Sequence, residues 1–182
     1  MRMRIGVSLA AAILTSAAIL PAIPAQADET DYLARFEGRW SGSGSMKPTA
    51  KAVSVPLGCS ANGEPGRSTL SLGGQCSALV LSRNLSADLI FNPATRRYSG
   101  VYVTEGDPPA ALDGTRVGDA LVLAVKWPKP VNGDSDAVMI IRNAGQGHFT
   151  FTVRDAAEPG GPLVTTASFT LNREGRAAHA GN

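Results

Sequence analysis

Short alternating runs bounded by turn residues dominate this sequence and constrain its fold most strongly. From Gly38 to Asn172, polar and apolar residues alternate between Gly, Pro, Asn and Asp clusters, which is typical of β-strands. The connections are too short for the crossover helices that parallel strands need, so the sheet must be antiparallel. We expect an all-β, up-and-down antiparallel barrel of about 8–10 strands, because closure removes exposed sheet edges. A two-sheet β-sandwich is the alternative.

The expected strands follow from this alternation and from the turns between them. Gly42, Gly44 and Gly100 indicate strong bending or close backbone approach within strands. Residues 78–85 fit either an extended strand or a turn of helix. The expected strands are 38–46, 52–60, 66–77, 87–92, 97–104, 110–116, 120–127, 137–143, 148–155 and 163–173.

A short helical turn is expected before the first strand. Thr30 or Asp31 is a suitable N-cap, and Gly38 is a suitable stop. Apolar residues at spacings of three and four share one face of this turn, namely Tyr32, Leu33 and Phe36.

Residues 1–27 have the pattern of a secretory signal peptide. Two arginines precede the apolar run 5–20, and Ala25-Gln26-Ala27 supplies the small-x-small cleavage pattern before Asp28. An uncleaved membrane anchor is disfavoured, since a span needs about 20 apolar residues. The sequence therefore predicts an exported protein, periplasmic or secreted, with no membrane span after cleavage.

Removing this segment changes the charge of the chain. The whole chain has 17 Lys and Arg residues, 15 Asp and Glu residues and a net charge of +2. The two arginines in the leader account for the excess, so the mature chain is neutral. Neither form has the basic stripe of a nucleic-acid-binding protein. We expect one domain over 28–173, followed by a flexible tail over 174–182.

The two cysteines predict a disulfide. Cys59 and Cys76 are the only cysteines in the chain, and an even count in an exported protein favours a structural bridge. A redox-active pair would favour a C-x-x-C spacing, which this sequence lacks. The closed loop would contribute about 3 kcal/mol through chain entropy.

The sequence offers no recognisable catalytic machinery. His148 and His179 are the only histidines, and neither a G-x-S-x-G elbow nor an H-E-x-x-H motif is present. Six aspartates fall at expected turns, where turn chemistry favours them, namely Asp107, Asp113, Asp119, Asp134, Asp136 and Asp155. We therefore expect no catalytic residue, no cofactor and no metal site, and we do not expect an enzyme.

One motif resembles a known superfamily. Residues 36–44, F-E-G-R-W-S-G-S-G, combine a short helical turn with a Gly-x-Trp strand opening, which resembles calycin barrels, the lipocalin and fatty-acid-binding superfamily. The resemblance implies that Trp40 closes one barrel end over the N-terminal turn and that Gly38 supplies a sharp entry. Residues 88–134 resemble a group of small exported bacterial proteins of unknown function, so this second likeness implies no activity.

A hollow barrel would use its large inward side chains to bind a ligand. Tyr98 and Tyr102 share one face, but both faces of their strand are partly apolar, so the pattern leaves inside and outside open. Arg142 would offer a cation, although its neighbours also leave its direction open. Trp40 fits a core plug as well as a ligand contact. The ligand-binding candidates are Trp40, Phe91, Tyr98, Tyr102, Trp127, Met139, Phe151 and Arg142.

These features predict an exported small binding protein. The expected partner is a small apolar ligand inside the barrel. The alternative is an envelope protein-interaction or inhibitor module, which would use exposed loops such as the Pro-bracketed segment 127–134 and would bind no ligand. A dry barrel with a filled interior is also compatible with the few aromatic residues. The sequence does not indicate an oligomeric state.

Overall fold

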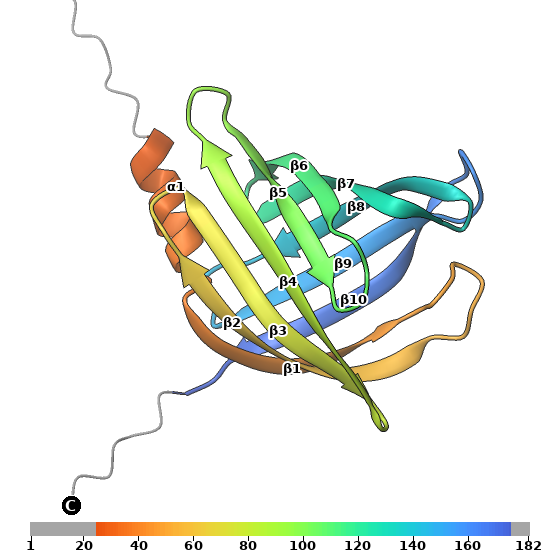
Figure 1. The fold of residues 1–182 in the computed structure, drawn as a ribbon. Helices are drawn as coiled ribbons and strands as arrows, with labels where there is room; N and C mark the ends of the chain where they lie inside the picture. The colour runs from red at the N-terminus through yellow and green to blue at the C-terminus, as the bar shows by residue number, and fades with distance from the viewer. Residues whose placement is uncertain (1–24, 176–182) are drawn as a thin grey trace, which may run out of the picture.

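Ten antiparallel strands close into a barrel, and one helix lies across one of its ends (Figure 1). The computed structural model describes residues 25–175. Neighbours in the sheet follow chain order, and the first strand pairs with the last, as in an up-and-down barrel. The elements are α1 (Ala25–Ala34), β1 (Gly38–Met46), β2 (Val55–Pro65), β3 (Thr69–Ala78), β4 (Leu81–Asn92), β5 (Arg97–Thr104), β6 (Ala110–Val117), β7 (Ala120–Val131), β8 (Asp134–Arg142), β9 (His148–Ala156) and β10 (Leu163–Arg173).

The topology confirms the predicted barrel and excludes the β-sandwich. The expected limits of β1, β5 and β10 agree with the structure. Residues 78–85 form a tight turn at Leu79 and Val80 and then the start of β4, because Ala78 pairs directly with Leu81. β7 continues to Val131, so much of the expected loop 127–134 belongs to a strand.

The helix differs from its prediction in where it begins. It starts at Ala25, so Thr30 and Asp31 lie inside it and do not cap it. It ends at Ala34, and Gly38 opens β1 with a φ of +94°, a value that favours glycine. The predicted signal peptide lies outside the described residues as far as residue 24, and its predicted cut falls in the first turn of α1. Residues 176–182 of the predicted tail also lie outside them.

The strands alternate between interior and exterior as the sequence pattern requires. On β7, Leu123 and Val125 are buried, and Ala124 between them is exposed. Leu121 on the same face is also fully buried. The structure shows which face of β5 points inward, a question that the sequence pattern left open. Tyr98 is fully buried, and Val101 is 40% exposed on the outer face.

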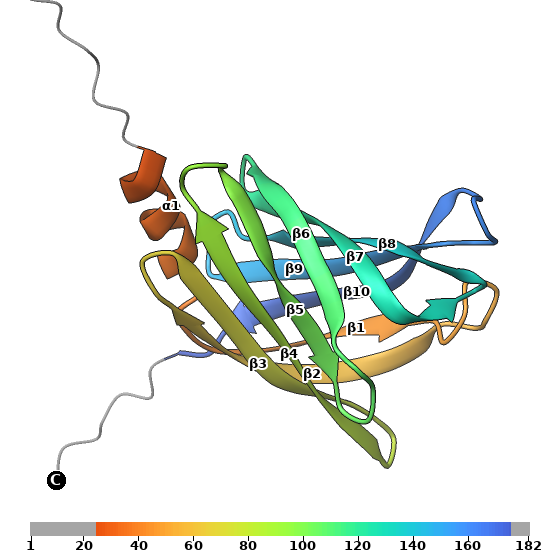
Figure 2. The ribbon, with the colours of Figure 1, turned by 45° about the horizontal axis from the view of Figure 1, so that its top comes forward.

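The close approaches predicted at Gly42, Gly44 and Gly100 are all present. A Cβ atom at Gly42 would lie 2.0 Å from the carbonyl oxygen of Thr170, and one at Gly100 would lie 1.9 Å from that of Asp88. Only glycine allows the backbones of these paired strands to approach so closely. Figure 2 shows the strands wrapping steeply around the barrel, with α1 beside one end.

Candidate functional site

The barrel end beside α1 is closed by aromatic packing. Trp40 is fully buried, its Nε1 donates to the carbonyl oxygen of Phe36 at 2.9 Å, and its ring meets Phe149 edge-on at 5.0 Å. Phe36 also packs against Phe149 and Tyr32, each at 5.6 Å between ring centroids. The Arg173 guanidinium lies over the Trp40 ring, 4.3 Å from its centroid. We call this region the closed end.

A buried carboxylate ties α1 to the closed end. Glu29 is 5% exposed, and Arg116 Nε donates to its two oxygens at 3.1 and 3.0 Å. Tyr98 donates its hydroxyl to the same carboxylate, and Arg116 also pairs with Asp28. Burial, and then the bond to Glu29, raise the pKa of Tyr98 well above its ordinary value of 10.0. These contacts fix α1 against the closed end of the barrel.

The opposite end of the barrel contains a cavity of about 710 Å³. This volume is within the range of about 300–1,000 Å³ that small-molecule sites occupy. Several inward positions near this end carry alanine, so the wall leaves space that larger residues would fill. We call this region the open end. The alanines that line the cavity are Ala78, Ala87, Ala110 and Ala167, together with Ala61, which lies deeper, opposite Trp40.

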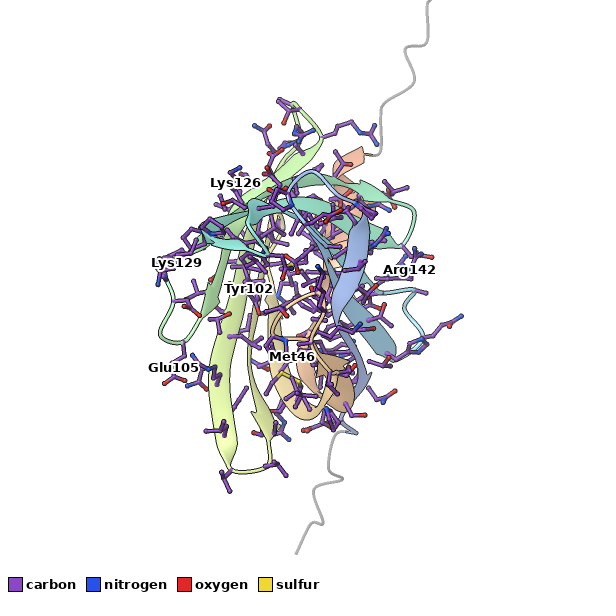
Figure 3. The ribbon with its side chains drawn as sticks, turned by 90° about the vertical axis from the view of Figure 1, so that its right-hand side faces the viewer. Met46, Tyr102, Glu105, Lys126, Lys129 and Arg142 are labelled. Carbon is purple, nitrogen blue, oxygen red and sulfur yellow. A yellow bond between two sulfur atoms is a disulfide. The ribbon has the colours of Figure 1, made fainter. Side chains whose placement is uncertain are left out.

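Aromatic side chains form one wall of the cavity. Tyr102 lies 6.1 Å from both Trp127 and Phe151 between ring centroids, and Phe151 lies 6.1 Å from Phe169. Figure 3 looks toward the open end and shows Tyr102 near the interior of the barrel. Burial raises the pKa of the Tyr102 hydroxyl, which therefore remains neutral at physiological pH.

One polar network lies within this wall. The Asp155 carboxylate is 4% exposed and accepts from Trp127 Nε1 at 2.7 Å and from the Thr166 hydroxyl. A β-bulge between Thr165 and Ala167 turns Thr166 toward Asp155. Throughout residues 28–175, every buried side-chain nitrogen or oxygen has a hydrogen-bond partner.

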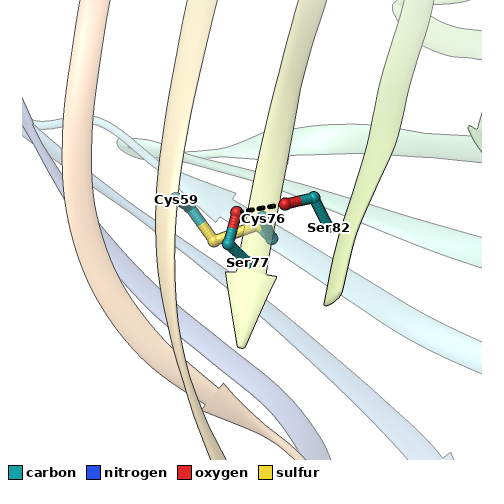
Figure 4. Close-up of a disulfide and its surroundings, with 4 residues drawn as sticks. All are labelled: Cys59, Cys76, Ser77 and Ser82. Atoms are coloured by element: carbon teal, nitrogen blue, oxygen red, sulfur yellow. Dashed lines mark hydrogen bonds between the residues drawn. A yellow bond between two sulfur atoms is a disulfide. The ribbon is translucent and has the colours of Figure 1, made fainter. Parts of the chain in front are cut away.

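The predicted disulfide is confirmed and lies at the cavity. Cys59 on β2 and Cys76 on β3 are directly opposite each other and are bonded (Figure 4). Both contribute to the cavity wall. Beside them, the hydroxyls of Ser77 and Ser82 share a hydrogen bond of 2.8 Å on the outer face. The bridge therefore cross-links two strands where the interior is least filled.

The structure separates the eight ligand-binding candidates. Tyr102, Trp127 and Phe151 line the cavity. Arg142 is exposed on the outer face and lies at the edge of the molecule in Figure 3, because its strand alternates with the buried Met139 and Ile141. The others are buried in the packed interior and do not line the cavity: Trp40, Phe91, Tyr98 and Met139.

Three important residues were missed by sequence reasoning. Asp155 was interpreted as a turn residue, although its parity with Phe151 and Val153 points inward. Thr166 is turned inward by a β-bulge, and no residue type in this segment predicts that bulge. Glu29 lies in a helix that was expected to begin later.

Neither a cluster of metal-ligating side chains nor a membrane-spanning helix is present among residues 25–175. Within the described range, no three His, Cys, Asp or Glu side chains form a group that could hold a metal ion. His148 is half-buried at the start of β9, and His179 lies outside the described residues. The one helix found there, α1, is too short and too polar to cross a lipid bilayer.

Comparison with solved structures supports the class of fold. The chain is similar to the protein in "Crystal Structure of Rv2717c from M. tuberculosis", with 16% sequence identity and a TM-score of 0.61. The match covers 80% of this chain and 96% of that one. At this identity the likeness concerns the fold alone. This similarity of fold is consistent with the resemblance of residues 36–44 to calycin barrels. No protein-family model and no curated protein matches the chain.

Proposed function

We propose that this protein is an exported β-barrel that binds one small apolar ligand in the open-end cavity. The observation that carries the proposal is the cavity of about 710 Å³ inside a barrel whose other end is tightly packed. Protein interiors normally contain few voids larger than a water molecule. An interior space of this size is therefore best explained by an occupant.

The wall chemistry supports an apolar ligand. Asp155, Trp127 and Thr166 satisfy one another, so their network offers few free hydrogen-bonding groups to an occupant. Most other lining side chains are aliphatic, aromatic or sulfur-containing. Charged lining residues come from strand ends and loops around the mouth, as Lys47, Arg83 and Lys129 do.

Export is supported by two separate features. The leader pattern of residues 1–27 predicts secretion. The Cys59–Cys76 disulfide is compatible with an oxidising compartment, where such bonds persist. The periplasm and the extracellular medium are both consistent with these features.

Filling the cavity tests the proposal directly. Ala110 faces the cavity and is 2% exposed, whereas its neighbour Ala111 is exposed on the outer face. We expect Ala110→Phe to weaken binding of an apolar fluorescent probe at least about tenfold, because the new ring occupies the binding volume. The matched variant Ala111→Phe should leave probe affinity unchanged. Equal affinities for both variants and the parent would contradict an internal site.

Native mass spectrometry of protein isolated from the exporting cell would identify the occupant. A retained small-molecule mass that disappears in Ala110→Phe but persists in Ala111→Phe is the expected result.

The alternative interaction module receives less support from its proposed loop, since Trp127 packs into the barrel and Pro128, Lys129 and Val131 line the cavity mouth. Capture of a protein partner by both variants, with no retained small molecule, would favour that alternative.

A further inference from the structure

Exposed apolar side chains are concentrated at one part of the open end. They lie at the ends of four consecutive strands, β1 to β4, and in the two loops that connect them. We call this region the β1–β4 rim. Six of the nine large hydrophobic residues that are exposed in the described chain belong to it: Met46, Val53, Val55, Leu79, Val80 and Leu81.

The turn between β3 and β4 is the most exposed part of this rim. Leu79 and Val80 are fully or almost fully exposed, at 103% and 95%, and Leu81 is 74% exposed. Figures 1 and 2 both show the tip of this hairpin projecting beyond its neighbours, at the end away from α1. Three consecutive large apolar residues on a projecting turn are unfavourable in water, so this tip is suited to contact with an apolar medium.

The charges of the β1–β4 rim have one sign. Its two loops and adjoining strand ends contain Lys47, Lys51 and Arg83, and residues 46–58 and 76–85 contain no acidic residue. Among the ion pairs of the described chain, none engages these three cations. Arg83 donates to the backbone carbonyl oxygen of Glu105 at 2.7 Å. Because a carbonyl is neutral, this bond does not neutralise the Arg83 charge.

The remainder of the open end has the opposite character. The loops that follow β5 and β9 carry Glu105, Asp107 and Glu158. The joined ends of β7 and β8 carry Lys129 and Asp134. Glu105 lies at the border between the two sides, because its carboxylate accepts from the backbone and the side chain of Asn84 on β4, both at 3.0 Å. The open end is thus divided into a basic, apolar side and a mainly acidic side.

We infer that the β1–β4 rim docks on an anionic lipid surface, with the Leu79–Leu81 tip inserted among the acyl chains. Apolar residues that enter the interface and cations that attract anionic headgroups are the two components of peripheral membrane binding. A convex tip suits a deformable bilayer better than a protein partner, which would need a matching pocket. The acidic side would be repelled, so the barrel would tilt toward β1–β4. This docking does not depend on an occupied cavity.

A tryptophan at the tip would report insertion locally. Val80→Trp places an indole at an exposed turn, and Val117→Trp is a matched control at a position 62% exposed near the closed end. The full chain is mixed with vesicles of phosphatidylcholine containing about 30% phosphatidylglycerol, with and without brominated acyl chains. We expect brominated lipid to quench Val80→Trp emission at least about twofold more than Val117→Trp emission. Both variants carry the same residues 1–27, so the difference between them reports the rim.

The charged component has a separate test. We expect Lys47→Gln and Lys51→Gln to weaken vesicle affinity about fivefold each, and added salt to weaken it further. Equal quenching of the two tryptophan variants would overturn the inference. A blue-shifted Val80→Trp emission without vesicles, rising with protein concentration, would also overturn it, because a second copy would then cover the tip. Quenching that is equally strong in pure phosphatidylcholine would refute the role of the cations.

Discussion

The two ends of the barrel are built from the same ten strands but have opposite interiors. At the closed end, large rings such as Trp40 and Phe149 interlock, and α1 is fixed by the buried Glu29–Arg116 pair. At the open end, alanines leave a cavity, and a disulfide and the Asp155 network reinforce its wall. The difference indicates a division of tasks, in which the closed end supplies stability and the open end supplies space.

The two tryptophans test this division most strongly. We expect Trp40→Ala to lower the free energy of unfolding by about 3–5 kcal/mol, because it empties a fully packed position. Trp127→Ala should cost about half as much, since Trp127 is only partly buried and faces the cavity. Urea unfolding followed by circular dichroism measures both values. Equal losses would mean that the open end is packed as tightly as the closed end.

The disulfide should give the next largest effect. Replacing both Cys59 and Cys76 by alanine is expected to lower the free energy of unfolding by about 3 kcal/mol, chiefly because the unfolded chain is no longer cross-linked. Both sulfurs line the cavity, so the affinity for an apolar probe should fall as well. Reduction of the unmodified protein provides the control. A variant with unchanged stability would show that the open end does not rely on the cross-link.

High pH should destabilise the closed end. Burial holds the pKa values of Tyr32 and Tyr98 above their ordinary value of 10.0, so the folded protein retains protons that the unfolded chain loses. Their contribution to stability is intact below about pH 10 and falls above it, by about 1.4 kcal/mol per pH unit for each tyrosine. Urea unfolding at a series of alkaline pH values measures the slope.

Single substitutions assign that slope to its residues. Tyr98→Phe should remove one tyrosine's share of the alkaline loss. Tyr102→Phe at the open end should also reduce it, because burial raises the pKa of Tyr102 as well. A slope that neither variant changes would contradict this assignment and would point to another group.

The fold was largely predictable because alternation and turn residues are local signals. The expected limits of β1, β5 and β10 were correct, and Gly42 and Gly100 marked close strand approaches. The helix start was not predictable in this way, since Ala25-Gln26-Ala27 fits both a cleavage site and a helical turn.

The candidate site was only partly predictable. Parity places Tyr98 and Tyr102 on one face of their strand but leaves open whether that face is the interior. It also does not show that Tyr98 contacts Glu29 in a packed region while Tyr102 lines the cavity. That distinction depends on depth along the barrel and on what α1 fills. The inward direction of Thr166 could not be predicted for another reason, because a β-bulge reverses the local alternation.

The pairing of the first and last strands has a consequence for how the chain reaches its native state. Trp40 pairs with Arg173, so the seam closes only when nearly all of the barrel sequence is present. Until then, every intermediate sheet has two unpaired edges, and contacts this distant in sequence form slowly. A growing chain therefore cannot complete this barrel before its last strand emerges from the ribosome.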